Sequence, residues 1–125
     1  AGYSPAGLFA LWAAYECDTF AGIACCSGSL WFKDWDIYMR EHKLKRKCSV
    51  YLSLGGKEEK TKNAVMEAVG DRTREQEKLL LEDPFAGRVV LEWNPGGHFA
   101  DSGKRLAKGI RWLLEKLKLL HLVKL

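Results

Sequence analysis

Short apolar stretches alternate with amphipathic stretches along this chain, and the alternation predicts a parallel α/β sheet. Strands buried on both faces carry nearly continuous apolar side chains, which predicts strands at 21–26, 49–54 and 89–93. Apolar residues at helical spacing predict helices at 5–16, 35–41 and 63–81. We expect one domain over residues 1–125.

The C-terminal region has the clearest helical pattern. Its large apolar residues advance by four, three, four and three positions, which predicts a stripe that packs on the sheet; they are Leu106, Ile110, Leu113, Leu117 and Leu120. The basic residues among them are expected on the solvated back of the helix, with contact to anionic lipid or nucleic acid as the weaker alternative; they are Lys104, Arg105, Lys108, Arg111, Lys116 and Lys118.

Composition indicates a globular domain with an apolar core. Hydrophobic residues make up 47% of the 125 positions, and a net charge of +4 from mixed signs argues against a dedicated nucleic-acid surface. No apolar run approaches the roughly 18 residues of a membrane span. Cys17, Cys25, Cys26 and Cys48 lack metal-ligand spacing, so we expect no metal site but buried, reduced thiols, which suit the cytoplasm. Cys25 and Cys26 should point to opposite faces of their strand.

The first residues resemble the Gly-x-Ser-x-Gly turn that exposes a serine nucleophile between a strand and a helix. Ser4 is then the nucleophile, and Gly2 and Ala6 are the small residues that let strand and helix approach. The strand leading into Gly2 would lie before residue 1. Pro5 suits the first helical position but has no N–H for the oxyanion hole, so we expect the Ala6 N–H to substitute or activity to be low.

Three predicted strands end in loops that carry chemically useful side chains. Ser4 follows the first, Glu58 or Glu59 follows the strand at 49–54, and His98 follows the strand at 89–93. Because the carboxyl ends of parallel strands share one edge of the sheet, these side chains should meet there. Serine, acid and histidine also follow in the order of the α/β-hydrolase triad. We expect His98 to accept the Ser4 proton and a carboxylate to orient the imidazole.

Four segments carry a family resemblance across nearly the whole chain: Gly2-Tyr3-Ser4 with Ala6 to Leu11, Ser27 to Trp31, Tyr51 to Gly55, and Gly97-His98-Phe99. They resemble the C-terminal half of the esterase family that includes siderophore esterases related to enterochelin esterase, feruloyl esterases and S-formylglutathione hydrolase. The resemblance implies a partial α/β-hydrolase fold of three α/β/α layers, without its N-terminal strands. It implies hydrolysis of small-molecule carboxylic esters with no cofactor or metal. Ser4 matches the nucleophile, His98 the base, and Glu58 the acid, with Glu59 as the alternative. Some siderophore esterases of this family work with a serine-histidine pair and weak acid support, and Glu58 is then a solvated loop carboxylate.

The family places its Ser-Gly-Ser-Leu-Trp loop near the active site. Trp31, Phe32 and Trp35 therefore line an acyl or aryl pocket beside Ser4 or, equally, cover the core under the loop. A siderophore lactone, a feruloyl ester and a short acyl ester remain open as substrates, because much of the substrate-binding surface in this fold comes from loops outside this sequence.

Because the N-terminal strands of the expected fold are not in this sequence, we expect the chain to associate with another chain. The apolar edge of the strand at 21–26 would face water, which favours aggregation unless another chain covers it. We expect a homo-oligomer that uses this edge or the apolar tail at 113–125, with a swapped C-terminal helix as one arrangement, or else a complementing N-terminal fragment. The second functional hypothesis is a non-catalytic interaction domain that kept the hydrolase scaffold.

Overall fold

Four parallel strands form one sheet in the computed structural model, which describes residues 1–117. The strands lie in sequence order and are β1 (Gly2–Tyr3), β2 (Gly22–Cys26), β3 (Cys48–Gly55) and β4 (Ala86–Asn94). The helices that connect or follow them are α1 (Pro5–Glu16), α2 (Trp35–Glu41), α3 (Val69–Glu82) and α4 (Ser102–Lys116), with short 3₁₀ turns η1 (Glu58–Lys60) and η2 (Met66–Ala68). The predicted α/β fold with a parallel sheet is confirmed.

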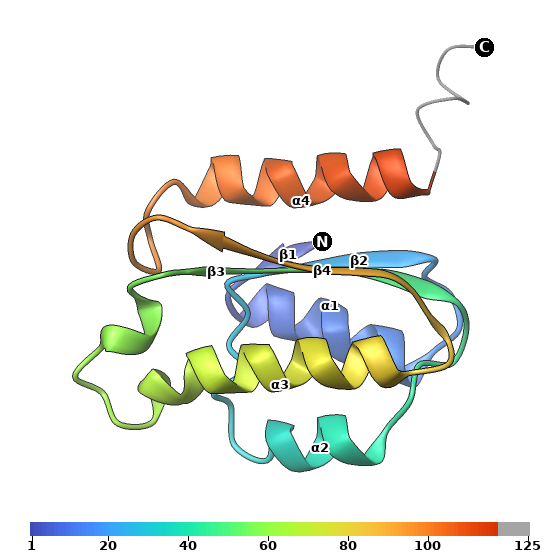
Figure 1. Ribbon diagram of the computed structural model, residues 1–125, viewed down its shortest axis with the longest axis horizontal. Coiled ribbons are helices and arrows are strands. Elements are labelled where there is room, and N and C mark those ends of the chain that lie inside the picture. The colour runs from blue at the N-terminus through green and yellow to red at the C-terminus, as the bar shows by residue number, and fades with distance from the viewer. Residues whose placement is uncertain (118–125) are drawn as a thin grey trace.

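Helices cover both faces of the sheet, so the fold has three layers. In Figure 1, α4 lies on one face, while α1 and α3 lie on the other with α2 beyond them. Successive strand residues point to opposite faces. Cys25 accordingly packs in the core on the α1 side, and Cys26 packs with Tyr51 on the α4 side. The prediction that the adjacent cysteines separate in this way is confirmed.

Two helical predictions need correction. The helix expected at 63–81 begins only at Val69, because the Asn63 side chain accepts hydrogen bonds from the N–H groups of Val65 and Met66 and turns the chain first. Of the apolar stripe predicted in α4, Leu106 and Leu113 pack against the sheet, but Ile110 is 42% exposed. The buried face is centred instead on Arg105 and Gly109; a side chain at Gly109 would lie 3.0 Å from Tyr51.

The turn between β1 and α1 requires glycine at its start. A Cβ at Gly2 would lie 2.2 Å from the Ala6 carbonyl oxygen, a backbone atom that cannot move aside. At Gly7, a Cβ would lie 3.1 Å from the Gly2 oxygen. The predicted close approach of strand and helix at the serine turn is therefore a feature of the structure.

Gly2→Ala is expected to lower the free energy of unfolding by about 1–3 kcal/mol or more, because the added methyl group overlaps backbone atoms. Urea denaturation measures the effect. Gly103→Ala is the matched control: a Cβ there meets nothing within 4 Å, so this change should leave stability unaltered or raise it by up to about 1 kcal/mol. Equal losses in both variants would contradict the expected clash.

One edge of the sheet is only partly paired. Gly2 and Tyr3 pair with Cys25 and Cys26, and an apolar cavity of about 260 Å³ lies beside the first half of β2. The predicted homo-oligomer or complementing fragment would use this edge or the tail, and it stays a prediction; Leu120 and the tail from residue 118 lie outside the described residues. Within residues 1–117 no helix is long and apolar enough to cross a membrane.

Candidate active site

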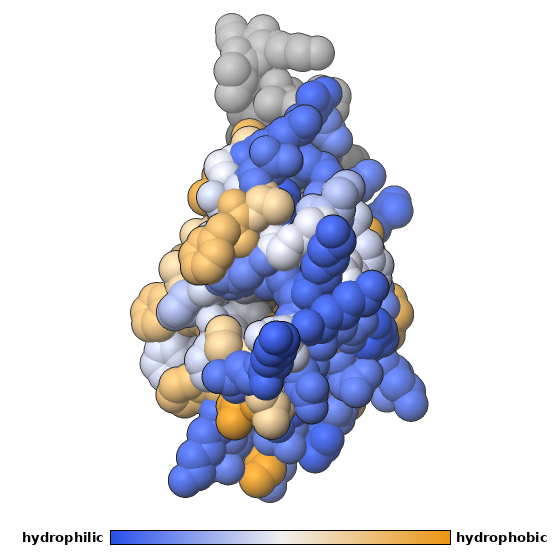
Figure 2. Space-filling model, turned by 90° about the vertical axis from the view of Figure 1, so that its left-hand side faces the viewer, coloured by the Kyte–Doolittle hydropathy of each residue, from blue (hydrophilic) through white to orange (hydrophobic). Residues whose placement is uncertain are grey.

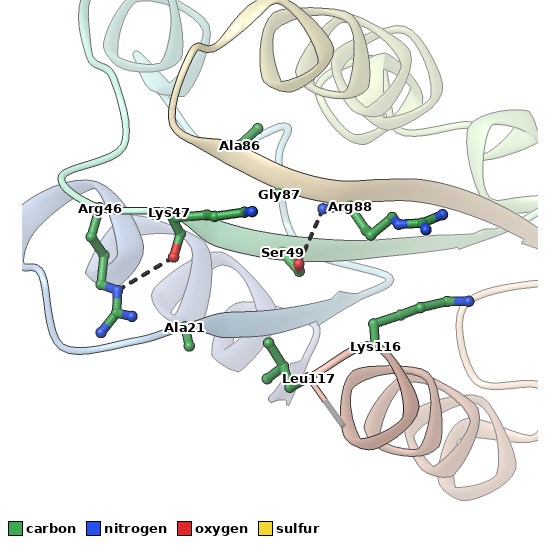
Figure 3. Close-up of a pocket in the computed structure, with 9 residues that line it drawn as sticks. All are labelled: Ala21, Arg46, Lys47, Ser49, Ala86, Gly87, Arg88, Lys116 and Leu117. Carbon is green, nitrogen blue, oxygen red and sulfur yellow. Dashed lines mark hydrogen bonds between the residues drawn. The ribbon is translucent and has the colours of Figure 1, made fainter. Parts of the chain in front are cut away.

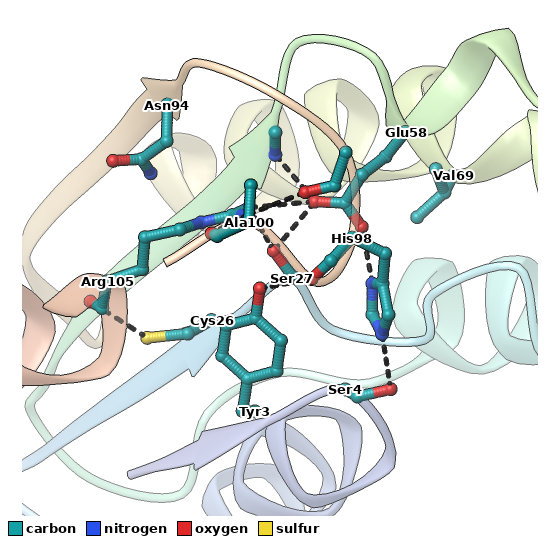
Figure 4. Close-up of polar contacts among 12 residues, drawn as sticks. Tyr3, Ser4, Cys26, Ser27, Glu58, Val69, Asn94, His98, Ala100 and Arg105 are labelled. Atoms are coloured by element: carbon teal, nitrogen blue, oxygen red, sulfur yellow. Dashed lines mark hydrogen bonds and ion pairs between the residues drawn. The ribbon is translucent and has the colours of Figure 1, made fainter. Parts of the chain in front are cut away.

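The loops that follow the four strands meet at the carboxyl edge of the sheet. They bring together Ser4 after β1, Ser27 after β2, Glu58 after β3 and His98 after β4 (Figure 4). Seen from this edge in Figure 2, apolar groups gather toward one side and hydrophilic groups cover the other. A cavity of about 440 Å³ opens here, and all four residues line it.

A continuous chain of hydrogen bonds joins the three residues that the sequence singled out. The His98 Nε2 atom lies 2.9 Å from the Ser4 Oγ atom, and the His98 Nδ1 atom lies 2.6 Å from the Glu58 Oε1 atom. With a proton on Nδ1, the imidazole donates to the carboxylate and its Nε2 accepts the serine proton. The three groups are thus connected in the sense that nucleophilic catalysis by serine requires.

The backbone of Ser4 is strained. Its φ of 61° and ψ of −124° lie in a region that side-chain-bearing residues rarely adopt. The Ser4 carbonyl accepts hydrogen bonds from the N–H groups of Gly7, Leu8 and Ser29, which hold the residue in this conformation. Strain of this kind presents the hydroxyl at the corner between β1 and α1, directly behind which the helix begins.

Glu58 is buried, and its two carboxylate oxygens have different partners. Oε1 faces His98, while Oε2 accepts hydrogen bonds from the Gly55 N–H at 2.6 Å, the Ser27 hydroxyl at 2.7 Å and the Arg105 guanidinium at 2.8 Å. Burial by itself raises the pKa of the Glu58 carboxyl, but the hydrogen bonds from Gly55, His98, Ser27 and Arg105 outweigh it and hold that pKa below its ordinary value. The carboxylate is therefore ionised at neutral pH and fixed in orientation.

Glu59, the alternative acid, points elsewhere. Its carboxylate pairs with Arg74 at 2.8 and 3.0 Å on the surface of α3, and no hydrogen bond joins it to His98. Adjacent residues of the 3₁₀ turn η1 face different directions, so only Glu58 reaches the imidazole.

Arg105, like Ser27, belongs to this network although the sequence indicated no such role for it. It was expected on the solvated back of the C-terminal helix, but it is only 2% exposed. Its guanidinium contacts Glu58, the Ser27 hydroxyl at 2.5 Å, and the carbonyls of Gly97 and Ala100 at 2.9 and 3.0 Å (Figure 4). Gly109, one helical turn after Arg105, is the sequence feature that could have indicated this burial. A helix packs closely on the sheet where it carries a glycine, and Arg105 lies on the same face as Gly109.

Tyr3 also contacts the loop that carries His98. Its hydroxyl donates a hydrogen bond of 2.5 Å to the His98 carbonyl, and the Arg105 guanidinium lies 5.6 Å above its ring. The backbone of the loop after β4 is therefore held from β1 and from α4 at the same time.

The predicted aromatic pocket is only partly formed. Trp31 lines the cavity, together with Phe99, Met66 and Val69. Phe32 and Trp35 line a separate apolar hollow outside it, so the prediction that they line the pocket beside Ser4 is wrong. For Trp35 the equal alternative, cover of the core, is confirmed. Trp35 is 5% exposed because it begins α2 and packs into the core, where its Nε1 donates to Gln76.

A larger cavity of about 600 Å³ lies at the opposite, amino ends of the strands (Figure 3). Arg46, Lys47, Arg88 and Lys116 line it, and the Ser49 hydroxyl there accepts a hydrogen bond from the Arg88 N–H. None of the three linked residues reaches this cavity, and ligands of open parallel sheets bind at the carboxyl ends. Among residues 1–117, no group of three or more His, Cys, Asp or Glu side chains is arranged to hold a metal ion.

The sheet order and the helices on both faces define a three-layer α/β fold with a parallel sheet (Figure 1), and a strained serine follows its first strand. A solved structure with this fold is siderophore hydrolase EstB from Aspergillus nidulans, to which the chain is similar with a TM-score of 0.67 and 21% sequence identity. The similarity covers 90% of this chain and 46% of that one, so the chain spans less than half the length of EstB. No protein-family description and no curated protein sequence matches the chain. At this identity the similarity concerns the fold alone, because one fold carries many different functions.

Proposed function

We propose that the chain is a serine hydrolase of carboxylic esters that forms an acyl-enzyme on Ser4. The observation that carries this proposal is the uninterrupted chain of hydrogen bonds from the Ser4 Oγ atom through His98 to Glu58. The position of these residues at the carboxyl edge of the sheet, the strained backbone of Ser4 and the cavity beside it support the same conclusion.

In the proposed reaction, His98 Nε2 removes the Ser4 proton as Oγ attacks the ester carbonyl carbon. The tetrahedral intermediate collapses, the bond to the leaving alcohol breaks, and the imidazolium returns the proton to that alcohol. Water then attacks the acyl-enzyme with His98 again as the base, which releases the acid and restores Ser4. Glu58 stabilises the imidazolium in both steps and stays ionised throughout.

The oxyanion hole is incomplete by the usual pattern. Pro5 follows the nucleophile and has no N–H, and one such donor contributes roughly 10²- to 10³-fold to turnover. The Ala6 N–H, in the first turn of α1, is the next donor of the helix and is our proposed substitute. Loss of the usual donor is also the observation that favours the second candidate function, a non-catalytic interaction domain built on the same fold.

The cavity favours an ester with an apolar or aromatic acyl group, because Trp31, Phe99, Met66 and Val69 form much of its wall. EstB is named a siderophore hydrolase, and a siderophore that contains an ester bond fits the proposal alongside feruloyl and short acyl esters.

Hydrolysis of p-nitrophenyl acetate and butyrate by the unmodified chain, together with labelling by a fluorophosphonate, tests the proposed function. We expect turnover above the buffer rate and one labelled residue, Ser4, identified by mass spectrometry. Ser29, whose hydroxyl lies 3.4 Å from the Ser4 hydroxyl, is the internal comparison and should stay unlabelled. Absence of both turnover and labelling would favour the interaction domain.

A further inference from the structure

We propose that Arg105 is a positioning residue that fixes the Glu58 carboxylate and the loop carrying His98 relative to each other, so that the imidazole points at Ser4. This inference rests on the proposed function for its catalytic consequence. Arg105 does not line the cavity and touches no position a substrate would occupy, so it acts through other residues.

The contacts of Arg105 divide between the two groups that must be aligned. One terminal nitrogen donates to Glu58 Oε2 and to the Ser27 hydroxyl, and the other donates to the carbonyls of Gly97 and Ala100, which flank His98. A planar guanidinium holds these acceptors in a fixed geometry that a flexible ammonium group cannot reproduce. Movement of the acid relative to the histidine loop would break at least one of these hydrogen bonds.

Ser27 links the guanidinium to the carboxylate a second time. Its hydroxyl accepts from Arg105 and donates to Glu58 Oε2, and its backbone has a φ of 44°, which is unfavourable for serine. Strained backbone persists where the surrounding structure requires a particular side-chain position. Here the required position lies between Arg105 and Glu58.

Stability alone does not explain this ion pair. The side chains of Arg105 and Glu58 are 3% and 4% exposed, and a buried pair of this kind adds little or nothing compared with apolar side chains of similar volume. Three hydrogen bonds already hold Oε2, which leaves Oε1 free to face the imidazole alone. The arrangement therefore favours orientation of the carboxylate as the role of the pair.

The test compares Arg105→Met, Arg105→Lys and the control Arg111→Met in the full chain. Arg111 lies on the same helix, is 82% exposed in its side chain and pairs only with Glu115 among the described residues. We expect Arg105→Met to lower kcat by about 10- to 100-fold with KM changed by less than about twofold, Arg105→Lys to recover part of kcat, and Arg111→Met to match the unmodified chain.

Proton NMR gives a readout that does not depend on turnover. The short hydrogen bond from His98 Nδ1 to Glu58 should give a strongly deshielded proton signal in the unmodified chain and in Arg111→Met, and this signal should disappear or broaden in Arg105→Met. If the unmodified chain shows the signal but no turnover, the esterase proposal fails while the positioning role is still supported by loss of the signal in Arg105→Met.

Unchanged kcat and an unchanged signal in a folded Arg105→Met variant would overturn the proposal. Should that variant fail to fold, Arg105→Lys decides, because an ammonium group cannot reach both the carboxylate and the loop carbonyls. A kcat about 10-fold lower with a weakened signal supports the positioning role, and wild-type values for both contradict it.

Discussion

Ser4→Ala is expected to lower kcat for p-nitrophenyl butyrate by about 10⁴-fold or more, and His98→Ala by a similar factor, because each removes one half of the proposed nucleophile and base pair. The Ser4 and His98 groups are 2.9 Å apart and act as a unit, so the double variant should be no slower than either single variant. Fluorophosphonate labelling should be lost in Ser4→Ala and strongly slowed in His98→Ala.

Ser29→Ala is the matched control for this prediction. Ser29 lies beside Ser4 but makes no hydrogen bond to His98 among the described residues, so the variant should keep turnover within a fewfold of the unmodified chain. The esterase mechanism through Ser4 fails if Ser4→Ala retains the turnover of the unmodified chain, or if Ser29→Ala loses it to the same extent.

Glu58→Gln is expected to lower kcat by about 10³- to 10⁴-fold, because an amide neither stabilises the imidazolium nor selects the tautomer in which Nδ1 carries the proton. Glu59→Gln is its control. Glu59 pairs with Arg74 on the surface and is not bonded to His98, so its replacement should leave kcat unchanged. Comparable losses in the two variants would contradict the assignment of Glu58 as the acid.

Glu58→Gln should also lower the free energy of unfolding at neutral pH by about 3 kcal/mol, because it leaves Arg105 with an unpaired buried charge. The pKa of Glu58 is lower in the folded chain than its ordinary value of 4.5, so its ionised form contributes stability above that pH. This contribution is lost as pH falls below about 4.5 and through the lower folded pKa. The stability difference between the unmodified chain and Glu58→Gln should therefore shrink with acidification, as urea denaturation at several pH values can show.

Much of the fold follows from local sequence patterns. The predicted limits of α1 and α2 match the structure, and β2, β3 and β4 lie where apolar runs predicted them, with β4 extending from Ala86 to Asn94. Such patterns report on neighbours within a few residues, because a strand repeats every two residues and a helix every 3.6. The serine turn is equally local, since Gly2 is required by an atom only four residues away.

Local sequence does not show which of two neighbouring candidate residues reaches the site. Glu58 and Glu59 are adjacent and chemically identical. Their distant partners decide which of them faces His98, 40 residues further along the chain: Arg105 holds Glu58, and Arg74 on α3 holds Glu59. Trp35 has an aromatic side chain that could equally line a pocket or fill the core. Its position at the start of α2 directs it into the core.

The parallel α/β architecture, the close turn at Ser4 and the order of serine, acid and histidine can be predicted from the amino-acid sequence. They depend on short-range patterns and on the rule that the carboxyl ends of parallel strands share an edge. The contact of Glu58 with His98 and the burial of Arg105 depend on long-range packing instead. Arg105 contacts Ser27 across 78 positions of sequence, and a charged residue becomes buried only where such distant partners satisfy it. No local pattern contains those partners.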